Sequence, residues 1–237
     1  MSKGPDMPEF KEFKDSNTLV AVLATQVAEL LRIGIKARGM ASLVVSGGST
    51  PVPFFAALSE LALDWQQVTI TLADERWVDP AAADSNEHLV RQHLLQNRAA
   101  LAQFVGLKTG AATAVQGEKE CGDRLALVPR PFDVLILGMG NDGHTASLFP
   151  QATRLGEALA MDSGKLCLAI TPPVAPHERM TLTLPALLQS RQIILHLVGS
   201  DKRMVYEKAL ANGPVAEMPI RAVLGQTTVP VTVFWAP

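Results

Sequence analysis

Strand-like runs of apolar residues alternate with amphipathic helical segments along most of this chain of 237 residues. β-Branched and aliphatic runs predict buried strands at residues 42–46, 68–72, 133–137, 166–170 and 193–198. A period of about 3.6 residues predicts helices at residues 16–36, 51–63, 85–96, 116–127 and 200–211. Residues 231–235, entered through a proline, predict a last strand at a sheet edge. This order is typical of an α/β fold, a mostly parallel twisted sheet flanked by helices on both faces in a Rossmann-like sandwich.

Neither a linker composition, an internal repeat nor a low-complexity tract divides the sequence. The length suits one to two domains of ordinary size. With 48% hydrophobic and 19% charged residues, the composition is that of an ordered globular protein. We therefore expect residues 1–237 to form a single domain.

The charge balance excludes a strong general attraction to polyanions. Lys and Arg number 21 against 23 Asp and Glu, for a net charge of −2, so we expect neither nucleic acid nor a membrane surface as a partner. Cys121 and Cys167 lie far apart and form no CxxC pair, which indicates reduced, buried thiols rather than a disulfide or zinc site. Without a secretory signal pattern at the N-terminus, a cytoplasmic location is expected.

Ligands of parallel α/β sheets bind at the carboxyl ends of the strands. There, SGGSTP at residues 46–51 joins a predicted strand to a predicted helix, with Thr50 expected as the N-cap and proline in the first turn. Glycine lets successive N–H groups converge on an anion at the helix start, so Gly47, Gly48, Ser49 and Thr50 are candidate phosphate-binding residues. An ordinary capped turn would have the same sequence. The segment is neither a P-loop nor a nucleophile elbow.

A second polar loop, DERW at residues 74–77, follows the next predicted strand. Asp74 and Arg76 are two positions apart and share a side if the chain stays extended. Arg76 could then clamp a phosphate while Asp74 faces a sugar hydroxyl. A solvated charge cluster is the alternative.

The third loop, GMGNDG at residues 138–143, matches the dinucleotide fingerprint G-x-G-x-x-G letter for letter. Pro150 follows too soon for the crossover helix that such a site requires. We therefore expect no nicotinamide or flavin cofactor. Gly140, Asn141 and Gly143 are instead predicted to let the backbone pass close to a ligand.

His144 follows this loop directly and is the candidate general base. An imidazole can take a proton from water near neutral pH, and Asp142 could set its tautomer. His177 is the only rival base, whereas three other histidines are interpreted as structural, namely His88, His93 and His196.

Two further cations are candidates for the same anion, Arg179 and Lys202. Lys202 follows a predicted strand, at a strand-to-helix junction. A surface lysine is the alternative interpretation. No cluster of His, Cys and Asp in the sequence has metal-ligand spacing.

In order, and across nearly the whole chain, these motifs resemble those of the 6-phosphogluconolactonases. The shared segments are SGGSTP at 46–51, DERWV at 74–78, DSN at 84–86, LGMGNDGHTASLFP at 137–150, RMTLTLP at 179–185 and GSDK at 199–202. The related glucosamine-6-phosphate isomerases typically continue the Asp-Gly-His core with Ile-Ala-Phe-Asn-Glu-Pro. Here Phe149 stands where that glutamate would be, which favours the lactonase, since the isomerase needs carboxylates to open an amino sugar and move a proton.

The resemblance implies hydrolysis of 6-phospho-D-glucono-1,5-lactone to 6-phospho-D-gluconate in the oxidative pentose phosphate pathway, with no cofactor or metal. It implies a catalytic group of His144, Asp142 and Asp74, a phosphate site of residues 47–50, Arg76, Arg179 and Lys202, and a monomer or homodimer. The alternative enzyme is a sugar-phosphate aldose-ketose isomerase. A non-catalytic sugar-phosphate sensor would need a DNA-binding module, for which the chain has no spare length.

Overall fold

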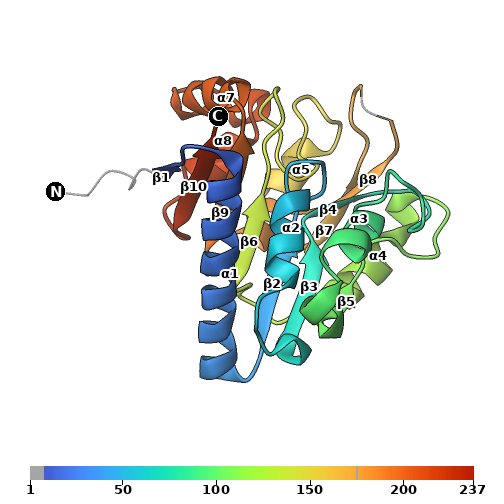
Figure 1. The fold of residues 1–237 in the computed structure, drawn as a ribbon. Coiled ribbons are helices and arrows are strands. Elements are labelled where there is room, and N and C mark those ends of the chain that lie inside the picture. Colours follow the sequence, from blue (N-terminus) through green and yellow to red (C-terminus); the bar gives the residue numbers. More distant parts are fainter. Residues whose placement is uncertain (1–7, 175) are drawn as a thin grey trace.

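The computed structural model describes residues 8–174 and 176–237. A seven-stranded sheet in the order β1-β10-β9-β6-β2-β3-β5 runs through the molecule (Figure 1). All of its neighbouring strands are parallel. Its strands are β1 (Glu9–Glu12), β2 (Ala41–Val45), β3 (Val68–Leu72), β5 (Gln103–Val105), β6 (Val134–Leu137), β9 (Ile193–Val198) and β10 (Val231–Ala236). The predicted α/β class with a mostly parallel sheet is confirmed.

A smaller antiparallel sheet lies beside the large one, in the order β4-β8-β7. Its strands are β4 (Asp74–Arg76), β7 (Cys167–Ile170) and β8 (Arg179–Leu182). The strand predicted at residues 166–170 therefore exists, but it pairs in this second sheet, which the sequence did not reveal. The expected edge position of residues 231–235 is wrong, because β1 pairs outside β10 and covers it.

The helices are α1 (Ser16–Arg38), α2 (Val52–Ser59), α3 (Asn86–His93), α4 (Ala114–Leu125), α5 (Leu155–Leu159), α6 (Leu184–Leu187), α7 (Ser200–Leu210) and α8 (Ile220–Leu224). Five of them, α1, α2, α3, α4 and α7, agree with the apolar periodicity to within a few residues at each end, whereas the short helices α5, α6 and α8 were not predicted. Helix α1 begins at Asp15, whose side chain accepts a hydrogen bond from the Thr18 N–H, and ends at Gly39 with a left-handed φ of 76°. Both ends of α1 are thus capped.

Helix α1 has the length and apolar composition of a membrane-spanning helix. In the structure it packs against α2 and the large sheet (Figure 1). Leu19, Leu23 and Leu31 on its inner face are completely buried in the core. A core helix passes the same test of length and composition, so α1 gives only weak support for a membrane span.

The order of the strands decides where the site lies. In the large sheet, β3 lies on one side of β2 and β6 lies on the other. β9 and then β10 follow beyond β6. Successive connections thus run in opposite directions from the β2–β6 pair, which opens a crevice at the carboxyl ends of these strands. The loops at residues 46–51 and 138–145 face each other across this crevice.

Candidate active site

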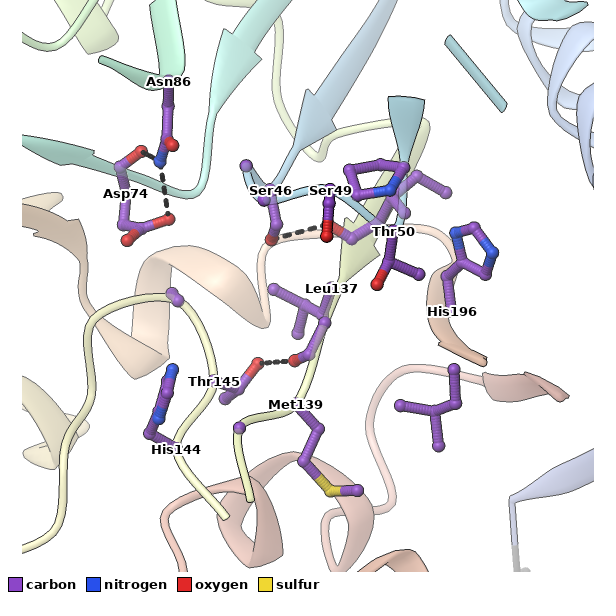
Figure 2. A pocket seen from close by; sticks show the side chains of 18 of the residues that line it. Ser46, Ser49, Thr50, Asp74, Asn86, Leu137, Met139, His144, Thr145 and His196 are labelled. Carbon is purple, nitrogen blue, oxygen red and sulfur yellow. Dashed lines mark hydrogen bonds between the residues drawn. The ribbon is translucent and has the colours of Figure 1, made fainter. Parts of the chain in front are cut away.

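A cavity of about 400 Å³ opens at the carboxyl ends of β2, β6 and β9 (Figure 2). Its wall is built by the loops after β2 and β6, the strand β4, the end of β9 and one residue each from helices α3 and α7. The lining side chains with polar groups are Ser46, Ser49, Thr50, Asp74, Arg76, Asn86, His144, Thr145, His196 and Lys202. This volume accommodates a sugar phosphate, and the wall combines cations with potential bases.

The loop at residues 46–51 forms one rim of this cavity. Gly48 adopts a φ of 98°, which favours glycine. A Cβ on Gly47 would lie 1.9 Å from Asn86 Oδ1, so only glycine allows the loop to pass over that side chain. The N-cap expected at Thr50 is wrong: α2 starts at Val52, its N-cap is Pro51, and no side chain caps it. The Thr50 side chain therefore stays available at the cavity wall.

The loop at residues 138–145 forms the opposite rim and folds as a closed turn. The Gly140 N–H donates to the His144 carbonyl at 2.9 Å, and the Gly143 N–H donates to the Gly140 carbonyl at 3.0 Å. Thr145 Oγ1 donates to the Gly138 carbonyl at 2.8 Å. No helix follows until Leu155, so the dinucleotide geometry is absent, as expected. The glycines shape the turn, and the amides of Gly140 and Gly143 are already engaged within it.

His144 and Asp142 form a close pair at this rim. His144 Nδ1 lies 2.6 Å from Asp142 Oδ1, and the same carboxylate oxygen accepts the His144 backbone N–H at 3.1 Å. Partial burial would raise the pKa of Asp142, but these hydrogen bonds and the neighbouring imidazole hold the pKa below the ordinary value of 3.8. The carboxylate thus stays ionised above pH 3.8, and its contribution to stability is lost only as pH falls through the lowered pKa. At neutral pH the ionised carboxylate accepts a hydrogen bond from Nδ1–H, which leaves the Nε2 lone pair free to accept a proton.

Phe149 packs against the other side of the imidazole, with ring centroids 4.3 Å apart. The Phe149 ring limits movement of the imidazole on the side that it contacts, while Asp142 holds Nδ1. Because Phe149 is apolar, this position supplies no carboxylate to the neighbourhood of His144. The two contacts together orient the imidazole of His144.

Asp74 lies at the start of β4 and is nearly buried, at 8% exposure. Its Oδ2 accepts a hydrogen bond from Ser147 Oγ at 2.6 Å. Asn86 Nδ2 donates to the Asp74 carbonyl at 2.9 Å and approaches Oδ1 at 3.4 Å (Figure 2). Asn86 is held in turn, since the buried Glu75 carboxylate accepts its backbone N–H at 2.7 Å. The Asp74 carboxylate is thus fixed at the cavity wall by residues from two other segments.

Sequence reasoning placed Asp74 in the site but missed the functional positions of Asn86, Ser147 and Thr145. Asn86 falls within the DSN segment and Thr145 directly follows His144, which were the available signals. Ser147 falls within the shared segment at residues 137–150, but its contact with Asp74 depends on the approach of β4.

Arg76 and Lys202, the two predicted anion-binding cations that follow strands β3 and β9, both line the cavity. Arg76 Nη1 donates to the Asp84 carbonyl at 2.5 Å. Lys202 Nζ donates to the Met139 carbonyl at 2.8 Å and to Asn141 Oδ1 at 2.7 Å. Burial lowers the pKa of Lys202, while Asp142 and Asp201 oppose that change. Lys202 thus ties the first turn of α7 to the loop that carries the imidazole.

Arg179 differs from these two cations in its placement. It pairs with Arg76 between β8 and β4, is 6% exposed, and is not part of the cavity wall. Within the described residues its Nε and Nη1 have no hydrogen-bond partner. Burial is the largest cause that lowers the pKa of the Arg179 guanidinium, and the positive charge of Arg76 lowers this pKa further. Its position beside Arg76 raises the positive potential at one end of the cavity.

Of the other four histidines, one lines the cavity and three do not. His177 Nε2 lies 3.1 Å from Asp84 Oδ2, outside the cavity wall. His88 and His93 lie half-buried on α3, as predicted. His196, interpreted as structural, lines the cavity. Within the described part of the chain, no group of three or more His, Cys, Asp or Glu side chains could hold a metal ion.

Gly140 supplies a sharp test of the His144 arrangement. A Cβ at this position would lie 2.1 Å from His144 Nδ1 and 2.7 Å from Asp142 Oδ1, between the two partners. We expect Gly140→Ala to displace the imidazole and to lower kcat by about 10²-fold or more. Steady-state rates would measure this, with Gly122→Ala on α4 as the control, since a Cβ there meets nothing within 4 Å and the position lies outside the cavity wall. Equal rates for the two variants would contradict the arrangement.

Comparisons with known proteins identify the family of this chain. The profile of the family described as glucosamine-6-phosphate isomerases/6-phosphogluconolactonase matches residues 14–235. A 6-phosphogluconolactonase of Pseudomonas putida is 43% identical over 99% of this chain and 96% of its own. The crystal structure of a 6-phosphogluconolactonase from Shewanella baltica is 51% identical over 99% of this chain and all of its own, with a TM-score of 0.96.

A more distant likeness concerns the fold alone. The structure of a monomeric glucosamine-6-phosphate deaminase is 18% identical, covers 96% of this chain and 97% of its own, and has a TM-score of 0.78. The family profile covers nearly the whole chain, and lactonase members of the family share 43% and 51% of its residues. The chain belongs to the glucosamine-6-phosphate isomerase/6-phosphogluconolactonase family.

Proposed function

We propose that this chain hydrolyses 6-phospho-D-glucono-1,5-lactone to 6-phospho-D-gluconate, the step of the oxidative pentose phosphate pathway implied by its lactonase relatives. The observation that carries the assignment to this site is the His144–Asp142 pair, with 2.6 Å between Nδ1 and Oδ1, on the wall of a cavity that also presents Arg76 and Lys202. Since the family profile spans residues 14–235, we infer that one domain carries the activity.

In the proposed reaction, His144 Nε2 takes a proton from a water molecule as the water oxygen attacks the lactone carbonyl carbon. The carbonyl electron pair moves to its oxygen, which forms a tetrahedral oxyanion. When the carbonyl re-forms, the bond to the ring oxygen breaks, and the imidazolium returns its proton to that oxygen as a hydroxyl. Asp142 stabilises the imidazolium between the two steps, because its carboxylate lies against Nδ1.

The phosphate end of the substrate would meet the opposite part of the cavity. The backbone of residues 47–50, together with Arg76 and Lys202, offers N–H donors and two positive charges to a dianion. Arg179 lies beside Arg76, outside the cavity wall, and adds to the positive potential there. Binding energy at this remote group then orients the lactone carbon toward His144. Asp74, fixed by Asn86 and Ser147, is placed to accept a hydrogen bond from a sugar hydroxyl.

The decay of freshly generated 6-phosphogluconolactone tests this proposal. Acid release is followed with and without the protein, and the His144→Ala variant serves as the background, because the lactone also opens unaided in water. A large acceleration that the variant lacks is the expected result. A wild-type protein that adds nothing to the spontaneous rate would contradict the proposed activity.

Asp142 is expected to matter through His144 rather than through the substrate. Asp142→Asn keeps the side chain's size but removes the negative charge beside Nδ1, so we expect kcat to fall roughly 10–100-fold with a smaller change in KM. Initial rates of acid release measure it. Asp84→Asn is the matched control, because Asp84 also pairs with a histidine, His177, at 3.1 Å. A larger loss for Asp84→Asn would move the base to His177.

The alternative within the family is aldose-ketose isomerisation of an amino-sugar phosphate. Phe149 argues against it, because the ring beside His144 supplies no carboxylate for proton transfer between carbons. The expected result is no ketose and no ammonia from glucosamine 6-phosphate. Release of either product at a rate comparable to lactone hydrolysis would favour the isomerase.

A further inference from the structure

His196 interrupts an otherwise aliphatic strand. β9 reads IILHLV, and Ile193, Ile194, Leu195 and Leu197 are all buried to within 1% of full coverage. His196 itself is 4% exposed. It pairs in register with Phe234 of β10, so it stands inside the large sheet and close to the carboxyl end of its strand. An aliphatic side chain would satisfy the packing at this position without burying a polar ring.

The imidazole of His196 has unmet hydrogen-bonding capacity. Both Nδ1 and Nε2 are buried and have no hydrogen-bond partner among the described residues. Burial lowers the pKa of His196 to about 4, so the ring is neutral at physiological pH and carries one N–H donor. Buried polar groups in native proteins are nearly always paired, so this donor calls for a partner that the protein itself does not supply.

The position of His196 places this donor beside the anion-binding loop. Its ring meets the Phe54 ring edge-on, with centroids 6.2 Å apart. Phe54 is in the first turn of α2, directly after the loop at residues 46–51. His196 lines the same cavity as Thr50 and Lys202, and Figure 2 shows its ring on the side of the cavity where Thr50 is drawn, away from His144.

We propose that His196 is a specificity-determining residue, whose neutral imidazole donates a ring N–H to the phosphoryl end of the bound sugar phosphate. This inference rests on the proposed function, since it takes the ligand to be a sugar phosphate. Both ring nitrogens are closed to bulk water. The hydrogen bond to the ligand therefore forms as the ring turns about its Cβ–Cγ bond. This torsion has broad preferences in histidine. A neutral donor adds to the charges of Arg76 and Lys202 without a further desolvated cation.

The test uses equilibrium binding, which needs no turnover. The probe is 6-phospho-D-gluconate, and unphosphorylated D-gluconate is the comparison, each titrated by calorimetry into the wild-type protein and into His196→Phe, which keeps a ring of similar size without its donor. We expect the Kd for the phosphorylated probe to rise roughly tenfold or more and that for gluconate to stay unchanged. His196→Gln restores an N–H donor and is expected to recover part of the affinity.

Thermal unfolding separates this role from packing. Because the phenyl ring removes two unpaired buried nitrogens, His196→Phe is expected to keep or raise the Tm while it weakens phosphate binding. His93→Phe, on α3 and outside the cavity, is the matched control and should change neither quantity. A residue that only fills space would lower the Tm and affect both probes alike.

The outcomes also separate this inference from the proposed activity. A wild-type protein that binds 6-phospho-D-gluconate but hydrolyses no lactone would end the proposed function and leave the His196 contact standing. Unchanged affinity in His196→Phe would overturn the contact even if hydrolysis is confirmed. An equal loss for both probes, or no measurable binding of the phosphorylated probe by the wild type, would overturn it as well.

Discussion

Replacing His144 with glutamine is expected to lower kcat for 6-phospho-D-glucono-1,5-lactone by about 10²–10⁴-fold, the usual contribution of a general base. Glutamine retains polarity and approximate length but cannot take a proton at neutral pH. KM should change little, because the phosphate end of the cavity is untouched. The measurement is acid release under saturating substrate, corrected for spontaneous hydrolysis.

His177→Gln is the matched control for this variant. Like His144, His177 lies beside a carboxylate, with 3.1 Å between Nε2 and Asp84 Oδ2, but it does not line the cavity. We expect its variant to retain wild-type kcat. Full activity in His144→Gln combined with a loss in His177→Gln would reverse the assignment of the base.

Removing a cation from the phosphate end is expected to abolish much of the preference for a phosphorylated substrate. For Arg76→Ala and Lys202→Ala we expect kcat/KM for 6-phosphogluconolactone to fall about 10–10²-fold each, since each variant loses a charge-assisted hydrogen bond to a dianion. Hydrolysis of unphosphorylated gluconolactone should be nearly unaffected. Comparing kcat/KM for the two lactones measures the discrimination directly.

Lys202 needs its own control, because its Nζ also holds the Met139 carbonyl and Asn141 Oδ1. A variant that merely loosened the 138–145 loop would slow both lactones equally. Lys208→Ala, on the exposed side of the same helix α7, tests whether a lost lysine charge alone matters and should leave both rates unchanged. Undiminished discrimination in Arg76→Ala and Lys202→Ala would remove both side chains from the phosphate site.

Apolar periodicity predicted the central strands because they are buried on both faces. Every residue of β2 and β6 is covered, so their sequences are almost entirely apolar, with Ser42 of β2 as the exception. β1 and β4, with sequences EFKE and DER, escaped this criterion because they carry charges. Whether a strand joins the large or the small sheet depends on pairing between distant segments, which periodicity does not encode.

In the candidate site, too, contacts between residues close in the sequence were predictable and contacts between distant segments were not. Asp142 and His144 are two residues apart, so a short loop suffices to bring Nδ1 to the carboxylate, and the sequence predicted their association. The contact of Ser147 with Asp74 joins residues 73 positions apart in the chain. No local pattern marks such a contact, because both side chains acquire their roles only when β4 approaches the segment that contains Ser147.

The sequence by itself determined the α/β class, the glycine-rich loop after β2 and the pairing of His144 with Asp142, because each depends on short-range spacing or on burial periodicity. Tertiary structure alone decided that Arg179 stands behind Arg76, that β1 covers the edge of β10, and that His196 lines the cavity. The physical reason is that strand order and side-chain burial arise from packing between distant segments. The same histidine in an aliphatic strand is a core residue in one sheet order and part of a binding site in another.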